Sequence, residues 1–402
     1  MKIFRTAQIK ELDKYTIMHE PIAPVDLMER AVQKLYNWFI SRNFIYSEVI
    51  VVAGNGNNGG DGLALARMLA LSNYKCEVWN ICTGNNHSDE WNVNMKRLSL
   101  ETDVHVITVN NITEIPVIPE NCIIIDALFG SGLSKPVKGF ASEVIKKINL
   151  SNSKVISIDI PSGLAGEDNA NYDPESIIQA DFTLTFQFPK LAFLFPENEK
   201  YTGKWELLDI GLHKEGIEKI DSSFYYLEAD EIAEKISARA RFSHKGLFGH
   251  GLFIGGSKGK MGAVILGSKA SLRTGAGLIS CLFPEGGNNI LQTSVPELMT
   301  ICDKETGHIG SVIETDPFDA VAIGPGIGTN QDTQQTVLNF ITECRKPMVI
   351  DADALNILSE HKDYLKKLPS KVILTPHLKE FERMAGRSVS GYDRLLSQID
   401  MA

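Results

Sequence analysis

The sequence predicts an α/β protein whose sheets are parallel. Apolar runs of strand length recur along the chain, and most lead through glycine or turn residues into a segment with helical apolar spacing. Such alternation implies parallel strands with helices on both faces of the sheet. A length of 402 residues suggests two or three domains, and 43% hydrophobic with 22% charged residues is ordinary for a globular protein.

Two helices are expected ahead of the first sheet strand. The first begins at Thr6 as its N-cap, and the second spans residues 25–41 with Pro24 in its first turn. Apolar residues recur at helical spacing in both segments, so one face of each helix is expected to cover the sheet.

The loop at residues 54–62 organises the first half of the chain. It follows an apolar strand at residues 49–52, and its glycines and the next helix's free N–H groups suit an anion such as phosphate. The spacing Gly54-x-Gly56-x-x-Gly59 matches the dinucleotide fingerprint, but the second strand does not end in the acid that a nicotinamide dehydrogenase uses. We therefore expect a ligand site that is not a dehydrogenase site.

The rest of the first half completes a doubly wound, Rossmann-like three-layer domain at residues 1–212. A polar linker at residues 213–222 and a second α/β domain at residues 223–402 should follow. Strands are expected at residues 76–82, 104–108, 122–126, 154–159 and 205–209, with one more before Phe186; helices are expected near 89–100 and 140–148.

Three motifs lie at the predicted carboxyl ends of strands: residues 57–61, 126–132 and 159–163. A carboxylate where a buried strand ends is costly unless it meets a cation, a donor or a substrate. Taken singly, Asp126 and Asp159 could instead cap turns. Together, the motifs are expected to enclose one pocket in which Asn58, Asp126 and Ser162 hold a monovalent cation and Asp159 faces substrate.

Three lysines near this pocket have two interpretations each. Lys135 and Lys138 could neutralise phosphates, although solvated surface lysines are more frequent. Lys190, after the sixth strand, could reach the pocket or lie in a surface turn.

The second half repeats the strand, glycine loop and helix arrangement, with strands expected near residues 251–254, 278–283, 320–323, 348–351 and 372–374. Glycines 324–328 suit an anion, and Asp351, Asp353 and Asn356 could coordinate magnesium or a hydroxyl group. His377 could be structural, but its position at a strand end favours a site.

Composition excludes several partners. A net charge of −10 argues against nucleic acid and anionic membranes, which need a basic surface. No run reaches membrane-spanning length, and no signal peptide is expected. Six cysteines without a CxxC pair are read as buried, reduced thiols, which predicts a cytoplasmic protein. We expect it to be a homo-oligomer.

Three motifs in the first half carry a family resemblance: residues 51–69, the run IIIDALFGSGLSKPVKG and the run ISIDIPSG. They resemble the epimerase domain of the bifunctional NAD(P)H-hydrate repair enzymes, from Met1 to about Leu212. The resemblance implies that hydrated NADH or NADPH, written NAD(P)HX, binds here and that its R and S forms interconvert at C6 of the nicotinamide ring.

The resemblance also implies roles at single positions. Asp159 resembles the acid that contacts substrate, and it is the best candidate for the catalytic proton shuttle that either ring opening or loss of hydroxide requires. Asn58, Asp126 and Ser162 resemble potassium ligands. The substrate-binding segments correspond to Asn57, Asn58, Gly59, Gly60 and Asp61, and to Gly130, Ser131, Gly132, Leu133, Ser134, Lys135 and Pro136.

The second half resembles the ribokinase-like dehydratase domain of the same family. The motifs are GGSKGKMGAVILGSKASLRTGAGL, SVPELM, GPGIG, DADALN and LTPHLKEF, in this order. By position, Ala263, Gly326 and His377 resemble contacts to the hydrated cofactor. The family's reaction implies ADP or ATP with Mg²⁺: the C6 hydroxyl of the S form is phosphorylated, and phosphate then leaves to restore NAD(P)H.

One departure from the family concerns the Gly-x-Gly-Asp loop, whose aspartate is the dehydratase base. No such motif follows Leu212, so the domain is expected to be incomplete and the 402 residues to have epimerase activity with little dehydratase activity. An apolar helix face containing Leu395, Leu396, Ile399 and Met401 should then lack its strands. Two alternatives stay open: a ribokinase-type small-molecule kinase and a non-catalytic nucleotide-binding module.

Overall fold

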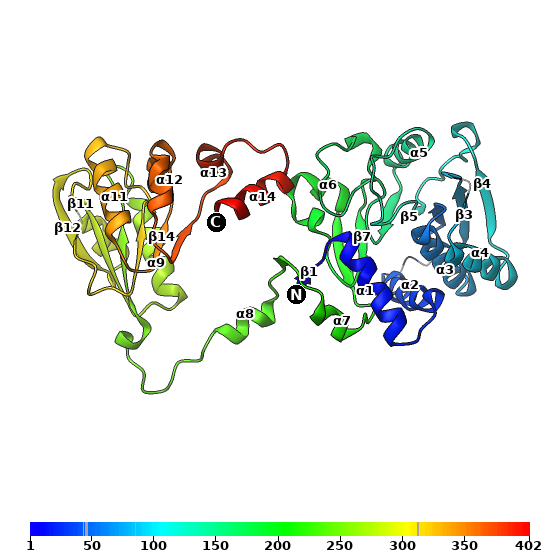
Figure 1. The fold of residues 1–402 in the computed structure, drawn as a ribbon, viewed down its shortest axis with the longest axis horizontal. Helices are drawn as coiled ribbons and strands as arrows, with labels where there is room; N and C mark the ends of the chain where they lie inside the picture. The colour runs from blue at the N-terminus through cyan, green and yellow to red at the C-terminus, as the bar shows by residue number, and fades with distance from the viewer. Residues whose placement is uncertain (43, 45–46, 85, 312) are drawn as a thin grey trace. The chain divides into compact units, whose positions relative to one another are not determined.

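The chain forms two compact units in a computed structural model that describes residues 1–42, 44, 47–84, 86–311 and 313–402 (Figure 1). Unit 1 contains Met1–Lys235, Val389–Asp400 and Ala402, and unit 2 contains Ile236–Ser388 and Met401. The expected linker at residues 213–222 lies inside unit 1, where helix α7 (Lys214–Lys219) contacts helix α1 (Thr6–His19). The linker expectation was wrong because Ile217 and Ile220 pack against the apolar cluster around Leu12.

Unit 1 is built on a seven-stranded sheet in which every pairing is parallel. The strand order is β4-β3-β2-β5-β6-β7-β8, so the winding reverses between β2 and β5. In doubly wound sheets, ligands bind beyond the carboxyl ends of strands at such a reversal. The strands are β2 (Val49–Ala53), β3 (Cys76–Ile81), β4 (His105–Val109), β5 (Ile123–Ala127), β6 (Lys154–Ile158), β7 (Phe182–Phe186) and β8 (Lys204–Leu208).

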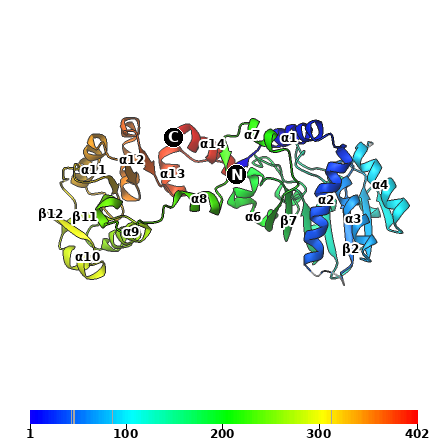
Figure 2. The same ribbon diagram turned by 90° about the horizontal axis from the view of Figure 1, so that it is seen from below.

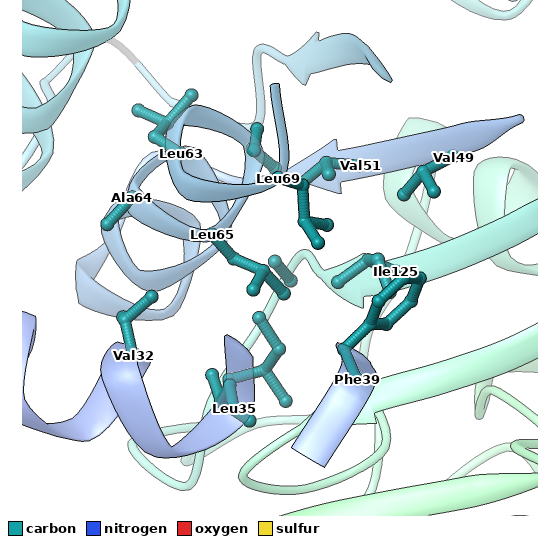
Figure 3. Close-up of a cluster of buried hydrophobic side chains, with 14 of the residues drawn as sticks. Val32, Leu35, Phe39, Val49, Val51, Leu63, Ala64, Leu65, Leu69 and Ile125 are labelled. Carbon is teal, nitrogen blue, oxygen red and sulfur yellow. The ribbon is translucent and has the colours of Figure 1, made fainter. Parts of the chain in front are cut away.

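Helices cover both faces of this sheet, which gives the three expected layers. Helices α2 (Pro24–Ser41), α3 (Asn57–Leu71) and α4 (Asp89–Glu101) lie together on one face (Figure 2). Figure 3 shows side chains of α2 and α3 in one cluster with Val49 and Val51 of β2. The alternate residues Ile50 and Val52 face the other cluster, which α5 (Phe140–Asn149) covers. Full burial of each such side chain stabilises the fold by roughly 1.5–3 kcal/mol.

The two ends of unit 1 meet in a small antiparallel sheet. Strand β1 (Lys2–Ile3) pairs with β9 (Phe224–Tyr225), and helix α8 (Ala229–Lys235) closes this part of the unit. The apolar run near residue 224 therefore completes the first domain instead of opening the second. Shorter pieces of unit 1 are helix α6 (Glu199–Thr202) and the 3-10 turns η1 (Ile112–Glu114), η2 (Pro174–Ser176), η3 (Leu191–Leu194) and η4 (Pro196–Asn198).

Unit 2 has a six-stranded parallel sheet in the order β12-β11-β10-β13-β14-β15, with its reversal between β10 and β13. The edge strand β12 (Met299–Thr306) was not predicted, because Thr300, Asp303 and Lys304 interrupt its apolar pattern. The other strands are β10 (His250–Ile254), β11 (Leu278–Glu285), β13 (Ala320–Ile323), β14 (Met348–Ile350) and β15 (Val372–Leu374).

The helices of unit 2 are α9 (Met261–Thr274), α10 (Asn288–Ser294), α11 (Gln331–Glu343), α12 (Asp353–Glu360) and α13 (Leu378–Ala385), with 3-10 turns η5 (Lys245–Phe248) and η6 (Lys362–Lys367). The predicted α/β class with parallel sheets is confirmed.

Helix α14 (Gly391–Met401) only partly shows the expected uncovered face. Leu395 packs with Ile3 and Phe195 of unit 1, whereas Leu396 and Ile399 are 41% and 51% exposed. The cysteine expectation also needs correction, because Cys302 is exposed. Within the described ranges, no helix is both long enough and apolar enough to cross a membrane.

Candidate functional site

The loop between β2 and α3 has a shape that only glycine permits at two positions. A Cβ added at Gly54 would lie 2.0 Å from the Leu128 carbonyl oxygen, and one at Gly59 would lie 1.9 Å from the Gly54 carbonyl oxygen. Both contacts are with backbone, so a larger residue would force the loop apart. The glycines thus bring the start of α3 close to the end of β5, at the reversal point of the sheet.

A cavity of about 680 Å³ lies at this reversal point. Its volume is within the range of small-molecule sites, which is about 300–1,000 Å³. Elements far apart in the sequence line it, including α1, α2, the β2–α3 loop and the loops after β5, β6 and β7. Of the predicted site residues, those lining it are Asn57, Asn58, Asp61, Gly130, Ser131, Gly132, Leu133, Ser134, Lys135 and Asp159.

Other predicted residues do not line this cavity. Gly59 packs against the Gly54 backbone, Gly60 faces Met28 and Trp91, and Pro136 is also outside the lining. Asp126 and Ser162 form a buried layer under the loop after β5. For these positions the structure supports a role in shaping the site.

Asp159 and Lys190 form a buried ion pair in the cavity wall. The Lys190 ammonium lies 2.7 Å from Asp159 Oδ1, with the side chains 2% and 13% exposed, and also donates to Thr185 Oγ1 at 2.8 Å. Burial by itself would raise the pKa of Asp159, but the charge and hydrogen bond of Lys190, aided by the Phe186 amide, hold that pKa below its ordinary value. The pocket interpretation of Lys190 is therefore the one that the structure supports.

Two of the other carboxyl groups that line the cavity have raised pKa values. Burial raises the pKa of Asp13 on α1 to about 6, with the Asp159 carboxylate adding to the rise and Lys190 opposing it. Burial also raises the pKa of Asp61 well above its ordinary value, and Asp159, Asp13 and Glu90 raise it further. The cavity thus combines a carboxylate paired with a cation and carboxyl groups that keep their protons more readily. Such a pair of states can both accept and donate protons around one ligand.

The candidate cation site is a compact set of oxygen atoms. Buried Asp126 accepts hydrogen bonds from Ser157 Oγ at 2.7 Å, and from the Ser162 amide at 2.8 Å and its hydroxyl at 2.5 Å. Ser162 also contacts both backbone groups of Phe129. Despite these donors, burial raises the pKa of Asp126, which indicates a carboxylate short of positive charge.

Asn58 lies beside this set, against Gly130. One end of its side-chain amide, assigned as Nδ2, is buried and has no hydrogen-bond partner in the part of the chain that the structure describes. The assignment of amide oxygen and nitrogen depends on the surrounding network, and an oxygen at this end would suit a cation. The hard oxygen atoms of Asn58, Asp126 and Ser162 therefore fit potassium.

In unit 2, Ala263 and Gly326 are brought together. Gly326 has φ +67°, and a Cβ added there would lie 3.3 Å from the Ala263 Cβ. Asp353 accepts from Lys260 Nζ at 3.0 Å and from the Gly328 amide at 2.9 Å. Both loops therefore meet at the reversal point between β10 and β13.

The remaining polar residues predicted in unit 2 have partners within the protein. His377 caps α13 in a reciprocal arrangement with Glu380, which is the structural role that the sequence left open. Asp351 accepts from Thr375, and Asn356 accepts from Arg383. Across the described ranges, no cluster of three or more His, Cys, Asp or Glu side chains suited to a metal was found.

Sequence reasoning missed Asp13 as a member of the site. It lies on the same face of α1 as Ile9 and Ile17, four residues from each, and all three line the cavity. The sequence did contain a signal, because an acidic residue among the apolar positions of a helix that packs on the sheet is unusual. Asn55 was also missed: its side chain joins the β2–α3 loop to the end of β3 by accepting from the Thr83 amide at 3.0 Å.

Fold and site together define a two-unit α/β protein with a ligand cavity at the reversal point of its first sheet. Residues 25–192 match the family described as YjeF-related protein N-terminus, and residues 252–401 match NAD(P)H-hydrate dehydratase. The chain is 32% identical to a bifunctional NAD(P)H-hydrate repair enzyme from Dictyoglomus turgidum, over 97% of this chain and 77% of that protein. The counterpart in Escherichia coli is 33% identical over 85% of this chain and 63% of that protein.

The chain belongs to the family of bifunctional NAD(P)H-hydrate repair enzymes. This confirms the predicted resemblance and the prediction that the protein is an enzyme. Among solved structures, an ADP/ATP-dependent NAD(P)H-hydrate dehydratase from Bacillus subtilis is 28% identical, with a TM-score of 0.35 over 43% of this chain and 59% of that one.

Proposed function

We propose that unit 1 interconverts the R and S forms of hydrated NADH and NADPH at C6 of the nicotinamide ring. The observation that carries this proposal is the buried Asp159–Lys190 pair, which faces a cavity of about 680 Å³ beside carboxyl groups of raised pKa. C6 bears a hydroxyl and is bonded to the ring nitrogen, so epimerisation needs a proton acceptor and a proton donor. The cavity supplies both.

The residues around the cavity have distinct roles in this proposal. Asp159, kept ionised by Lys190, accepts or returns the proton, and the loops at residues 57–61 and 130–136 hold the cofactor's phosphates and sugar. The N-terminus of α3 and Lys135 favour anionic groups there. Potassium held by Asn58, Asp126 and Ser162 would add positive charge under the loop after β5.

The test is a time course of pure R-NADHX with the full chain, in potassium buffer and again without potassium. We expect the R and S forms to equilibrate faster than spontaneously, and the acceleration to be lost in Asp159→Asn. No acceleration, with tight binding retained in both proteins, would favour the non-catalytic binding module. Product analysis of the same samples with ATP would detect a phosphorylated small molecule if unit 2 were a kinase of another class.

For unit 2 we propose the family's second reaction, dehydration of the S form with ADP or ATP and Mg²⁺, at a low rate in these 402 residues because no Gly-x-Gly-Asp motif follows Leu212. What supports this is the meeting of Ala263 and Gly326 at the reversal point of the second sheet, where Gly326 permits a close backbone approach. The measurement is nucleotide-dependent recovery of NADH absorbance from pure S-NADHX, with ADP and ATP compared.

We also propose that the protein acts in the cytoplasm, since its six cysteines are free of disulfides. That it forms a homo-oligomer stays a prediction, which light scattering of the purified chain would test.

A further inference from the structure

Asp61 differs from Asp126 and Asp159, the other two aspartates at the strand ends, because it has no partner among the residues that the structure describes. It lies in the first turns of α3 and lines the cavity, where it is 9% exposed. Among the residues that the structure describes, none forms a hydrogen bond or an ion pair with its carboxyl group, whereas Asp126 has several donors and Asp159 has Lys190. A buried polar group without a partner is costly, so a ligand is the group that would satisfy Asp61.

The charged groups that line the cavity are four acids, of which Asp61 is one, and three lysines. The others come from every neighbouring element and are Lys10 and Asp13 on α1, Glu90 on α4, Lys135 after β5, Asp159 after β6 and Lys190 after β7. Lys190 is engaged by Asp159, and Lys10 lies near Gly132. Burial, followed by the charges of Asp159, Asp13 and Glu90, raises the pKa of Asp61 well above its ordinary value, which favours its protonated form.

We propose that Asp61 is the general acid of the epimerisation and Asp159 its base, with Asp13 as the positioning residue that keeps Asp61 protonated. This inference rests on the proposed function of unit 1. It assigns opposite protonation states to two aspartates of one cavity, and the geometry explains them, because only Asp159 has a lysine beside it.

Asp61 gives its proton to the C6 hydroxyl, the C6–O bond breaks with its electron pair on oxygen, and water leaves. The lone pair of the ring nitrogen forms a double bond to C6, and the ring becomes a cation. Water then adds to the opposite face of C6 and loses a proton to Asp159, while the electrons of the double bond return to nitrogen. Reaction in the reverse direction exchanges the two roles.

The experiment compares catalysed R-to-S equilibration between pH 6 and 10 for the full chain and its variants, after subtraction of the spontaneous rate. An amide resembles a protonated carboxyl in shape and can donate a hydrogen bond, but it cannot transfer the proton. Asp61→Asn should therefore retain NADHX binding within about tenfold but slow epimerisation by about 10²–10⁴-fold. Asp61→Glu should restore part of the rate, and Asp103→Asn, an exposed aspartate away from the cavity, should behave as wild type.

Asp13 is tested by the shape of the pH profile. The rate of the wild type should fall at alkaline pH as Asp61 ionises. Because the Asp13 carboxylate raises the pKa of Asp61, Asp13→Asn should move this fall to lower pH. A merely structural role of Asp13 would lower the rate without moving the profile.

The outcomes separate this inference from the proposed function. A wild-type chain that does not accelerate epimerisation defeats the proposed function. An active wild type with an equally active Asp61→Asn variant overturns the inference alone. If Asp61→Asn does not fold, an unmoved alkaline limb in Asp13→Asn overturns it.

Discussion

Replacing Lys190 by methionine isolates the electrostatic role of this lysine. Methionine keeps an apolar stem of similar length but removes the cation that lies 2.7 Å from Asp159 Oδ1. Breaking a buried pair by removing one partner costs about 3–5 kcal/mol, because the remaining charge is uncompensated. Asp159 can limit this cost by taking up a proton, so the pKa of Asp159 should rise in the variant.

The loss of stability in Lys190→Met depends on pH. In the wild type, Asp159 has a lowered pKa, so its stabilising contribution is present above the unfolded pKa of about 3.9 and is lost only in stronger acid. In Lys190→Met, the Asp159 carboxyl is neutral in the folded state and ionised in the unfolded state. This difference lowers the free energy of unfolding by about 1.4 kcal/mol for each pH unit above 3.9, which is about 4 kcal/mol at pH 7. From pH 4.5 to pH 7, the stability difference between the two proteins should therefore grow by about 3 kcal/mol.

Tryptophan fluorescence during urea unfolding is a suitable assay, because Trp38, Trp79, Trp91 and Trp205, all four tryptophans of the chain, belong to unit 1. Lys14→Met, on the exposed side of α1, is the matched control and should follow the wild type at every pH.

Two results would decide the role of Lys190. The double variant with Asp159→Asn should lose the pH dependence, because no buried carboxyl is left to titrate at this position. A variant curve that runs parallel to the wild-type curve from pH 4.5 to 7 would refute the reasoning, since it would show that Lys190 does not set the protonation of Asp159.

Two further predictions concern the loop and the cation site. Gly59→Ala should prevent folding or destabilise unit 1 by more than about 3 kcal/mol, because the new Cβ would clash with the Gly54 carbonyl oxygen. The control is Gly84→Ala, since Gly84 has open space around it. Equal melting temperatures of the two variants would contradict the prediction. Ser162→Ala removes a hydroxyl that donates to Asp126 Oδ1 and accepts from the Phe129 amide, and it should cost about 1–3 kcal/mol of stability. It should also raise the potassium concentration needed for half-maximal epimerisation, and an unchanged potassium requirement would remove Ser162 from the proposed ligand set.

Much of the fold could be predicted from the hydrophobic pattern of the sequence alone. Strands buried on both faces, such as Val49–Ala53, read as continuous apolar runs, and the parallel sheet then required that the loops after β2, β5 and β6 meet. For this reason the sequence predicted that Asn58, Asp61 and Asp159 lie in one place. Strand β12 escaped prediction because an edge strand tolerates polar residues such as Asp303.

The parts that the sequence could not predict depend on contacts across long separations. Lys190 follows its strand like many surface lysines, and only the fold shows that Asp159 lies beside it. Asp13 required knowledge of which helix face meets the cavity. The end of unit 1 was misplaced for the same reason, since the pairing of Ile3 with Phe224 has no local signal.

The attachment of α1 has a consequence for synthesis. The helix that carries Asp13 is packed against α7, and β1 before it is paired with β9, so its anchors lie about 200 residues later in the chain. At about 5–20 residues per second, roughly 10–40 s separate the emergence of α1 from that of its partners at the ribosome. A nascent chain can therefore complete β2, its glycine loop and α3 well before the wall containing Asp13 is anchored, and the cavity closes around its acidic groups only after α7 and β9 have been made.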